Sequence, residues 1–160
     1  MTEPDAVMTR IGEGIALCQR GDREAARQLL AEAWEQVGPD GDPFHRCSIA
    51  HWMADVQDDE REELVWDLRA LAAAELITDE RARQAGLATP VRALFPSLHL
   101  NLGDVYRRLG DGRRAAEHLV RGEADADALA EDGYGKMIRA GLSRLAERLS
   151  AAPASLPADG

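Results

Sequence analysis

Three side chains in the first half of the chain have the types and spacing of a catalytic or metal-binding group. His51 and Asp55 lie four residues apart, so they share a face if this segment is a helix, and His45 is close by. Imidazole and carboxylate groups placed in this way can ligate a metal ion or act as acid and base. Such a pair is more often a solvated hydrogen bond, and the sequence contains no HExxH, GxSxG, phosphate-binding glycine loop or paired-cysteine motif. We therefore expect no catalytic residue, no cofactor and no bound metal.

The remaining polar and sulfur-containing groups favour structural roles. One acidic run comprises Asp55, Asp58, Asp59, Glu60, Glu62 and Glu63, and a second lies between Glu123 and Asp132. The first run lacks the spacing of a calcium loop and is typical of a helix start, where carboxylates oppose the helix dipole favourably. Cys18 and Cys47 lie in apolar helical patterns, which predicts reduced, buried thiols.

Composition limits the class of partner. The chain has 160 residues and a formal charge of −10, with 29 acidic against 19 basic side chains. Negative charge repels phosphate backbones, so we expect no binding to nucleic acid. The N-terminal residues include no charged and apolar leader and the chain has no membrane-length apolar run, which predicts a cytoplasmic protein. Lys136 is the single lysine, and this preference for arginine suggests a bacterial, actinobacterium-like source.

The elements that position these residues are helical hairpins. The segment 98–119 has apolar residues at helical spacing on both sides of Gly110-Asp111, which predicts a helix, a tight turn and a second helix. Gly21-Asp22 divides residues 7–40 in the same way. No segment alternates with the period of a strand, so the sequence predicts an all-α fold of about seven or more helices.

The spacing of Leu102, Gly103, Tyr106, Ala115 and Leu119 resembles the tetratricopeptide repeat (TPR) family, in which small residues let paired helices cross closely. The resemblance implies one TPR-like domain over residues 1–150, with repeats at about 7–40, 43–76 and 96–129. The first repeat has Gly14, Leu17, Ala26, Leu30 and Ala33 at the corresponding positions. The second has a degenerate second helix, although its Trp66 matches a large core position.

Residues outside the repeats are expected to connect or cap them. The insertion 77–95 is predicted to hold a short helix capped by Thr78 and a second helix start at Thr89-Pro90, and it is either a connector or a lid. Residues 134–150 have one apolar stripe, Ile138, Leu142, Leu145 and Leu149, with Arg144 and Arg148 off it, which is typical of a capping helix. Residues 151–160 are rich in Pro and Ala and are predicted to be disordered.

The resemblance implies a binding function, because TPR-like proteins receive peptides in a concave groove lined by the first helix of each repeat. The groove positions would be Phe44, Cys47, His51, Asp55, Leu100, Asp104, Arg107 and Arg108. Only Asn101 matches the family's carboxylate clamp. We expect a non-catalytic scaffold that binds a protein or peptide of unknown identity and could form a homodimer. A small-molecule- or metal-dependent enzyme on a helical scaffold and a self-associating structural protein remain alternatives.

Overall fold

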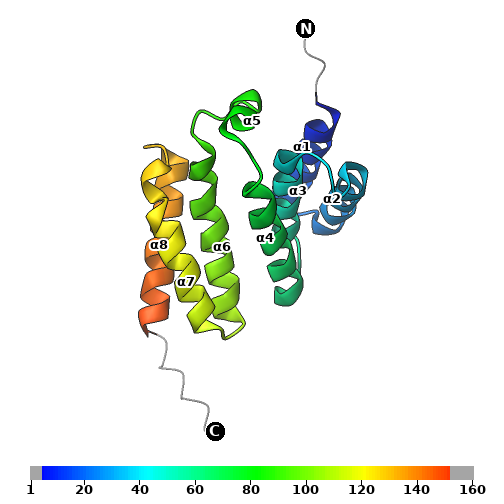
Figure 1. The fold of residues 1–160 in the computed structure, drawn as a ribbon. Helices are drawn as coiled ribbons and strands as arrows, with labels where there is room; N and C mark the ends of the chain where they lie inside the picture. Colours follow the sequence, from blue (N-terminus) through cyan, green and yellow to red (C-terminus); the bar gives the residue numbers. More distant parts are fainter. Residues whose placement is uncertain (1–4, 152–160) are drawn as a thin grey trace. The chain divides into compact units, whose positions relative to one another are not determined.

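The described part of the chain is entirely helical. The structure is a computed structural model that describes residues 5–151, and these form eight α-helices, two 3₁₀-helices and no strand. The prediction of an all-α fold is confirmed. The α-helices are α1 (Ala6–Gln19), α2 (Arg23–Val37), α3 (Pro43–Asp55), α4 (Glu60–Ala74), α5 (Asp79–Gln84), α6 (Phe95–Arg108), α7 (Gly112–Ala124) and α8 (Gly133–Ala151), and the 3₁₀-helices are η1 (Val91–Leu94) and η2 (Ala126–Ala128) (Figure 1).

Two Gly-Asp turns join paired helices in the same way. Gly21 and Gly110 take positive φ values of 82° and 85°, which end α1 and α6 without the steric cost that a Cβ would bring. The amides of Asp22 and Asp111 donate to the carbonyls of Leu17 and Tyr106 at 3.0 and 2.9 Å. Both aspartates then cap the next helix through their side chains. The predicted turns are therefore confirmed, with the glycine stopping one helix and the aspartate starting the next.

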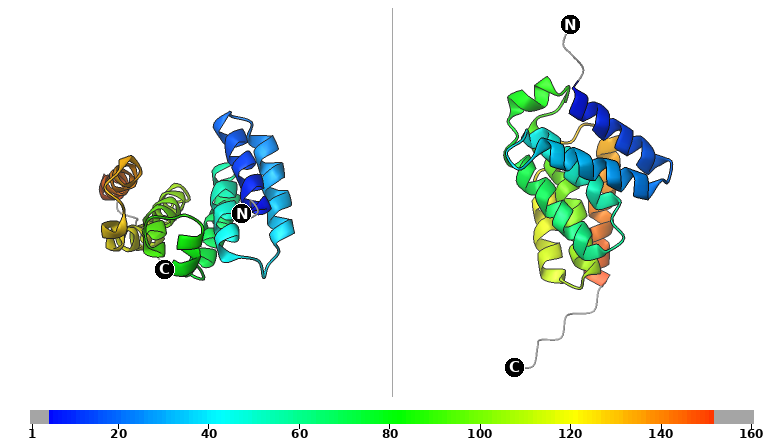
Figure 2. Two further views of the ribbon diagram at one scale, coloured as in Figure 1. Left: turned by 90° about the horizontal axis from the view of Figure 1, so that it is seen from above. Right: turned by 90° about the vertical axis from the view of Figure 1, so that its right-hand side faces the viewer.

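The chain forms two compact units, which meet in sequence between Val91 and Arg92. In unit 1, which contains helices α1 to α5, α1 and α2 pack side by side, and α3 packs against both of them and against α4 (Figures 1 and 2). A Cβ on Gly14 of α1 would lie 2.9 Å from the Leu30 side chain of α2. This close crossing explains why the position is glycine.

Two tryptophans join α2 to α4. Trp66 is 9% exposed, and its ring meets that of Trp34 at 5.0 Å between centroids in an edge-to-face geometry. The guanidinium groups of Arg46 and Arg69 lie 4.0 Å from the Trp34 ring and 4.5 Å from the Trp66 ring, respectively. Trp66 is therefore a core residue, as predicted.

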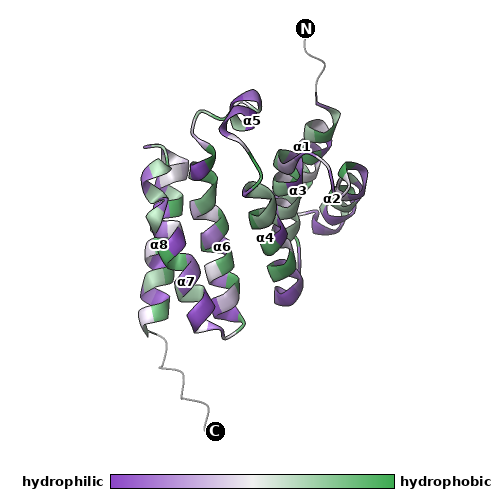
Figure 3. Cartoon of the chain, in the orientation of Figure 1, coloured by the Kyte–Doolittle hydropathy of each residue, from purple (hydrophilic) through white to green (hydrophobic). Residues whose placement is uncertain are grey.

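Unit 2 contains α6, α7 and α8, and each of these helices packs against the other two. Figure 3 shows apolar and polar faces on these helices, as their sequence periodicity predicts. A Cβ on Gly103 of α6 would lie 2.6 Å from the Leu145 side chain of α8 and 3.3 Å from the Ala115 carbonyl of α7. One core cluster combines Leu129 with Ile138 and Leu142, so the stripe predicted on residues 134–150 faces the interior.

The insertion follows its predicted pattern only in part. Thr78 caps α5 by accepting from the Arg81 amide at 3.1 Å, as expected. A helix does start close to the predicted Thr89-Pro90, but it is the 3₁₀-helix η1, which begins at Val91, so Pro90 does not take the first helical position as predicted. The helix η1 leads directly into α6. Pro96 is the proline that lies in the first turn of an α-helix here. The tail predicted at 151–160 lies outside the described residues, except Ala151, which ends α8.

Candidate functional site

The expected groove residues of α3 differ in how much surface they present. Phe44 is half-buried, and the Arg81 guanidinium lies 5.1 Å from its ring centroid. Cys47 is buried, and burial raises the pKa of its thiol to about 12. Cys47 therefore supports the helix from inside and presents little surface to a partner. Asp55 is exposed at the last turn of α3.

The histidines considered for chemistry have separate surroundings in unit 1. The Nδ1 atom of His51 is buried and has no hydrogen-bond partner among the described residues, and burial lowers the pKa of this imidazole. No hydrogen bond joins it to Asp55 in residues 5–151. The Nε2 atom of His45 instead lies 2.6 Å from the carboxylate of Asp5, which caps α1. Within the described residues, no group of three or more His, Cys, Asp or Glu side chains converges as metal ligands would.

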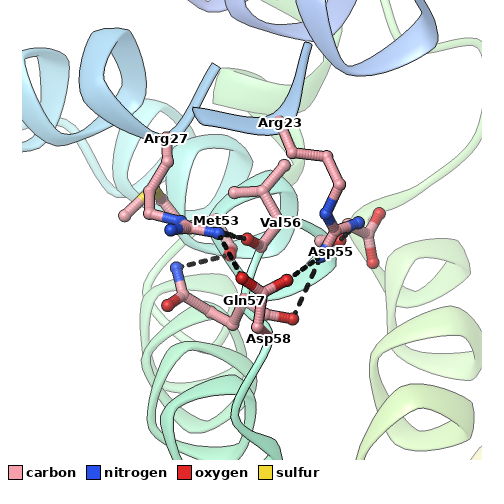
Figure 4. Close-up of polar contacts among 7 residues, drawn as sticks. All are labelled: Arg23, Arg27, Met53, Asp55, Val56, Gln57 and Asp58. Atoms are coloured by element: carbon pink, nitrogen blue, oxygen red, sulfur yellow. Dashed lines mark hydrogen bonds and ion pairs between the residues drawn. The ribbon is translucent and has the colours of Figure 1, made fainter. Parts of the chain in front are cut away.

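Two arginines of α2 bind the end of α3 (Figure 4). Arg27 donates to the Val56 carbonyl from Nε at 3.1 Å and from Nη2 at 2.6 Å. Arg23 donates to the carbonyls of Asp55 and Gln57 at 3.1 and 3.2 Å, and both guanidiniums contact the Asp58 carboxylate at 3.2 Å. These carbonyls lie where a helix leaves its acceptors without internal partners. The arginine pair thus fixes the loop between α3 and α4, a role that the sequence analysis missed.

The expected groove residues of α6 form an ion-pair cluster in unit 2. Asp104 accepts from Arg107 at 2.9 Å and from Arg108 at 3.0 Å, and Arg148 of α8 lies 3.7 Å away. Burial raises the pKa of the Asp104 carboxyl, but the hydrogen bonds and charges of Arg107 and Arg108 outweigh this effect and hold the pKa below its usual value. Asp104 is therefore ionised at neutral pH, and its negative charge is compensated by Arg107 and Arg108 of the same helix.

A surface hollow of about 200 Å³ lies between α6 and α8, beside this cluster. Its lining residues are Leu100, Asn101, Asp104, Gly141, Arg144, Leu145 and Arg148. The absence of a side chain on Gly141 permits the close approach of the two helices, since a Cβ there would lie 2.6 Å from the Leu100 side chain. The hollow has an apolar part, two exposed arginines and an amide, which is a combination suited to a polar segment with an anionic group.

The sequence predicts Leu100 and Asp104 as groove residues of the third repeat, but it places Arg144 and Arg148 only off the apolar stripe of a capping helix. Their spacing of four residues puts them on one side of α8, which is a signal that could have been used. The sequence could not show that this side of α8 lies against Asp104. That placement depends on how α8 packs on α6.

A buried histidine pair joins α6 to α7. The Nδ1 atoms of His99 and His118 lie 3.0 Å apart, so one ring donates its proton to the other. The Tyr106 ring stacks on His118 with centroids 5.5 Å apart. Burial, together with the neighbouring His118, lowers the pKa of His99 to about 4. The pair is uncharged at neutral pH and serves as polar packing within unit 2.

No known family model, curated protein or solved structure matches this chain. In the described part of the chain, the helices are too short or too polar to span a membrane. The functional assignment therefore depends on the surfaces of the two units themselves.

Proposed function

We propose that this chain is a non-catalytic module that binds a protein or peptide segment, and that the hollow between α6 and α8 is one of its contact surfaces. The observation that carries the proposal is the composition of this hollow, in which Leu100 and Leu145 supply apolar area while Asn101, Arg144 and Arg148 supply donors. Peptide sites combine these two features, because apolar area gives affinity and a few placed polar groups give specificity.

The packing within each unit supports a TPR-like interpretation. In unit 1, α3 packs against both helices of the preceding hairpin, and in unit 2, α8 packs against both α6 and α7. Successive helices of a repeat array stack in this manner, with each new first helix laid beside the preceding one. The hollow lies between α6 and α8, which correspond to first helices in such an array. This is the face on which TPR-like proteins receive their ligands.

The proposal assigns different roles to the expected groove residues. Phe44, His51 and Asp55 of α3 remain proposed contact residues of unit 1, whereas Cys47 acts through packing. In unit 2, Asp104 organises the arginines around it and does not serve as a free acceptor for a basic partner. The proposed site of action is the cytoplasm, where Cys18 and Cys47 stay as free thiols.

Site-specific photo-crosslinking in the native host tests the proposal. A photo-crosslinking amino acid at Asn101, inside the hollow, should trap a defined protein partner. The matched control carries the same group at Val120 of α7, which is 64% exposed and does not line the hollow. Adducts at position 101 alone support a binding surface between α6 and α8. Equal adducts at both positions, or none at position 101, would refute it.

A further inference from the structure

The charge around the α6–α8 hollow is opposite in sign to that of the chain. Two guanidinium groups, those of Arg144 and Arg148, and one carboxylate, that of Asp104, are among the residues that line the hollow. Asp104 is in addition hydrogen-bonded to Arg107 and Arg108 of its own helix. The chain as a whole has a formal charge of −10. A local excess of positive charge attracts an anionic group to this place, while the acidic remainder of the chain repels anions from other parts of the surface.

The donors in the hollow differ in whether they are already used. Arg107 and Arg108 make short hydrogen bonds to Asp104. Arg148 lies 3.7 Å from that carboxylate, beyond hydrogen-bond distance, and its side chain is 57% exposed. Arg144 and Asn101 make no hydrogen bond or ion pair within the described residues. The α8 arginines and the amide of Asn101 are thus available to a ligand, while Asp104 is satisfied by its own helix.

Helix geometry places the two available arginines side by side. Arg144 and Arg148 are separated by one helical turn of α8, so their guanidiniums extend over the same side of the helix. Two planar guanidiniums at this spacing can each donate paired hydrogen bonds to the oxygens of one tetrahedral anion. A phosphate group has three acceptor oxygens and a charge of about −1.5 to −2 at neutral pH.

We propose that the α6–α8 hollow binds a phosphorylated side chain of a peptide partner, with Arg144 and Arg148 holding the phosphate and Leu100 and Leu145 contacting the neighbouring residues. This inference depends on the proposed peptide-binding function and names its ligand chemistry. We favour a phosphate over a run of carboxylate side chains as the ligand, because carboxylates distribute their negative charge along the peptide and outside the hollow. The rest of this acidic chain would repel such a segment, whereas a phosphate concentrates its charge in the hollow.

Retention of the full chain on three immobilised peptide pools tests the proposal. Each pool consists of nonapeptides with a fixed central residue, either phosphoserine, serine or glutamate, and degenerate flanks. We expect binding to the phosphoserine pool to be at least about tenfold tighter than to the other two, and 10 mM inorganic phosphate to compete for it. The variant with Arg144→Gln and Arg148→Gln should lose this preference.

Controls separate loss of the site from loss of the fold. Arg144→Gln alone should weaken retention without unfolding unit 2, because Arg144 is exposed and makes no hydrogen bond or ion pair within residues 5–151. Arg121→Gln, at an exposed position of α7 outside the hollow, removes the same charge and should bind as the parent chain does. Far-UV circular dichroism verifies that each variant is folded.

Each contrary result has a distinct meaning. Equal retention on the glutamate pool would overturn the phosphate assignment but leave peptide binding intact. Phosphoserine binding that survives the double substitution would overturn the assignment to this hollow. Stronger competition by polyuridylate than by inorganic phosphate would show that the site prefers a nucleic acid. Absence of retention on every pool, together with absence of adducts at position 101, would overturn the proposed function itself.

Discussion

Arg27→Ala should destabilise unit 1 by removing the donors that satisfy the end of α3. The substitution deletes two hydrogen bonds to the Val56 carbonyl and one contact with Asp58. A buried carbonyl left without a donor costs about 1–3 kcal/mol, and a contact with an exposed carboxylate adds little. Because the Arg27 side chain is 36% exposed, water replaces part of the loss. We expect the free energy of unfolding to fall by about 2 kcal/mol.

The matched variant is Arg23→Ala, which removes a similar number of contacts from the same loop. The Arg23 side chain is 48% exposed, so its acceptors regain water more readily, and we expect a loss of about 1 kcal/mol. Arg27→Lys keeps the positive charge but has no guanidinium, so it cannot donate two hydrogen bonds to the Val56 carbonyl as Nε and Nη2 of Arg27 do. It should fall between the parent chain and Arg27→Ala.

Tryptophan fluorescence during urea unfolding isolates this effect. All three tryptophans, Trp34, Trp52 and Trp66, belong to unit 1, whereas both tyrosines, Tyr106 and Tyr134, belong to unit 2. The fluorescence transition therefore reports on unit 1, and its midpoint and slope give the free energy of unfolding. Equal losses for Arg27→Ala and Arg23→Ala, or full recovery in Arg27→Lys, would refute the assignment of a carbonyl-capping role to Arg27.

Core packing, histidine titration and metal binding can each be tested in the two units. Trp66→Ala should cost about 3–5 kcal/mol in urea unfolding, and a loss below about 1 kcal/mol would contradict its core role. Gly103→Val should destabilise unit 2 by about 1–3 kcal/mol by circular dichroism, while Gly112→Val, with nothing within 4 Å of its Cβ, should change stability much less. Because the pKa of His99 is about 4 in the fold and about 6.5 when unfolded, the unfolded chain binds more protons between these values, so unit 2 should lose stability as the pH falls from about 6.5 to about 4. The pH dependence should be shallower in His99→Gln, and an unchanged slope would exclude this histidine as its source. Zn²⁺, Mn²⁺ and Ca²⁺ should leave the melting temperature unchanged, whereas sub-micromolar binding that is lost in His51→Ala would revive a metal-dependent function.

The sequence by itself determined the local structure of this protein. Apolar periodicity predicted the helices, since a helical face repeats every 3.6 residues whatever it packs against. The turns at Gly21-Asp22 and Gly110-Asp111 were equally predictable, because a positive φ favours glycine and an orphan helix amide favours an aspartate cap. Even the core position of Trp66 followed from its register.

The tertiary structure decided which polar groups are used and which remain available. Nothing in the sequence indicates that Arg27 binds the Val56 carbonyl, that His99 pairs with His118, or that Arg148 lies beside Asp104. Periodicity gives the face of a helix on which a side chain lies but not the group that faces it on another helix. Hydrogen bonds and ion pairs act over a few ångströms, so their partners are set only when the packing of large side chains against glycines fixes how the helices cross.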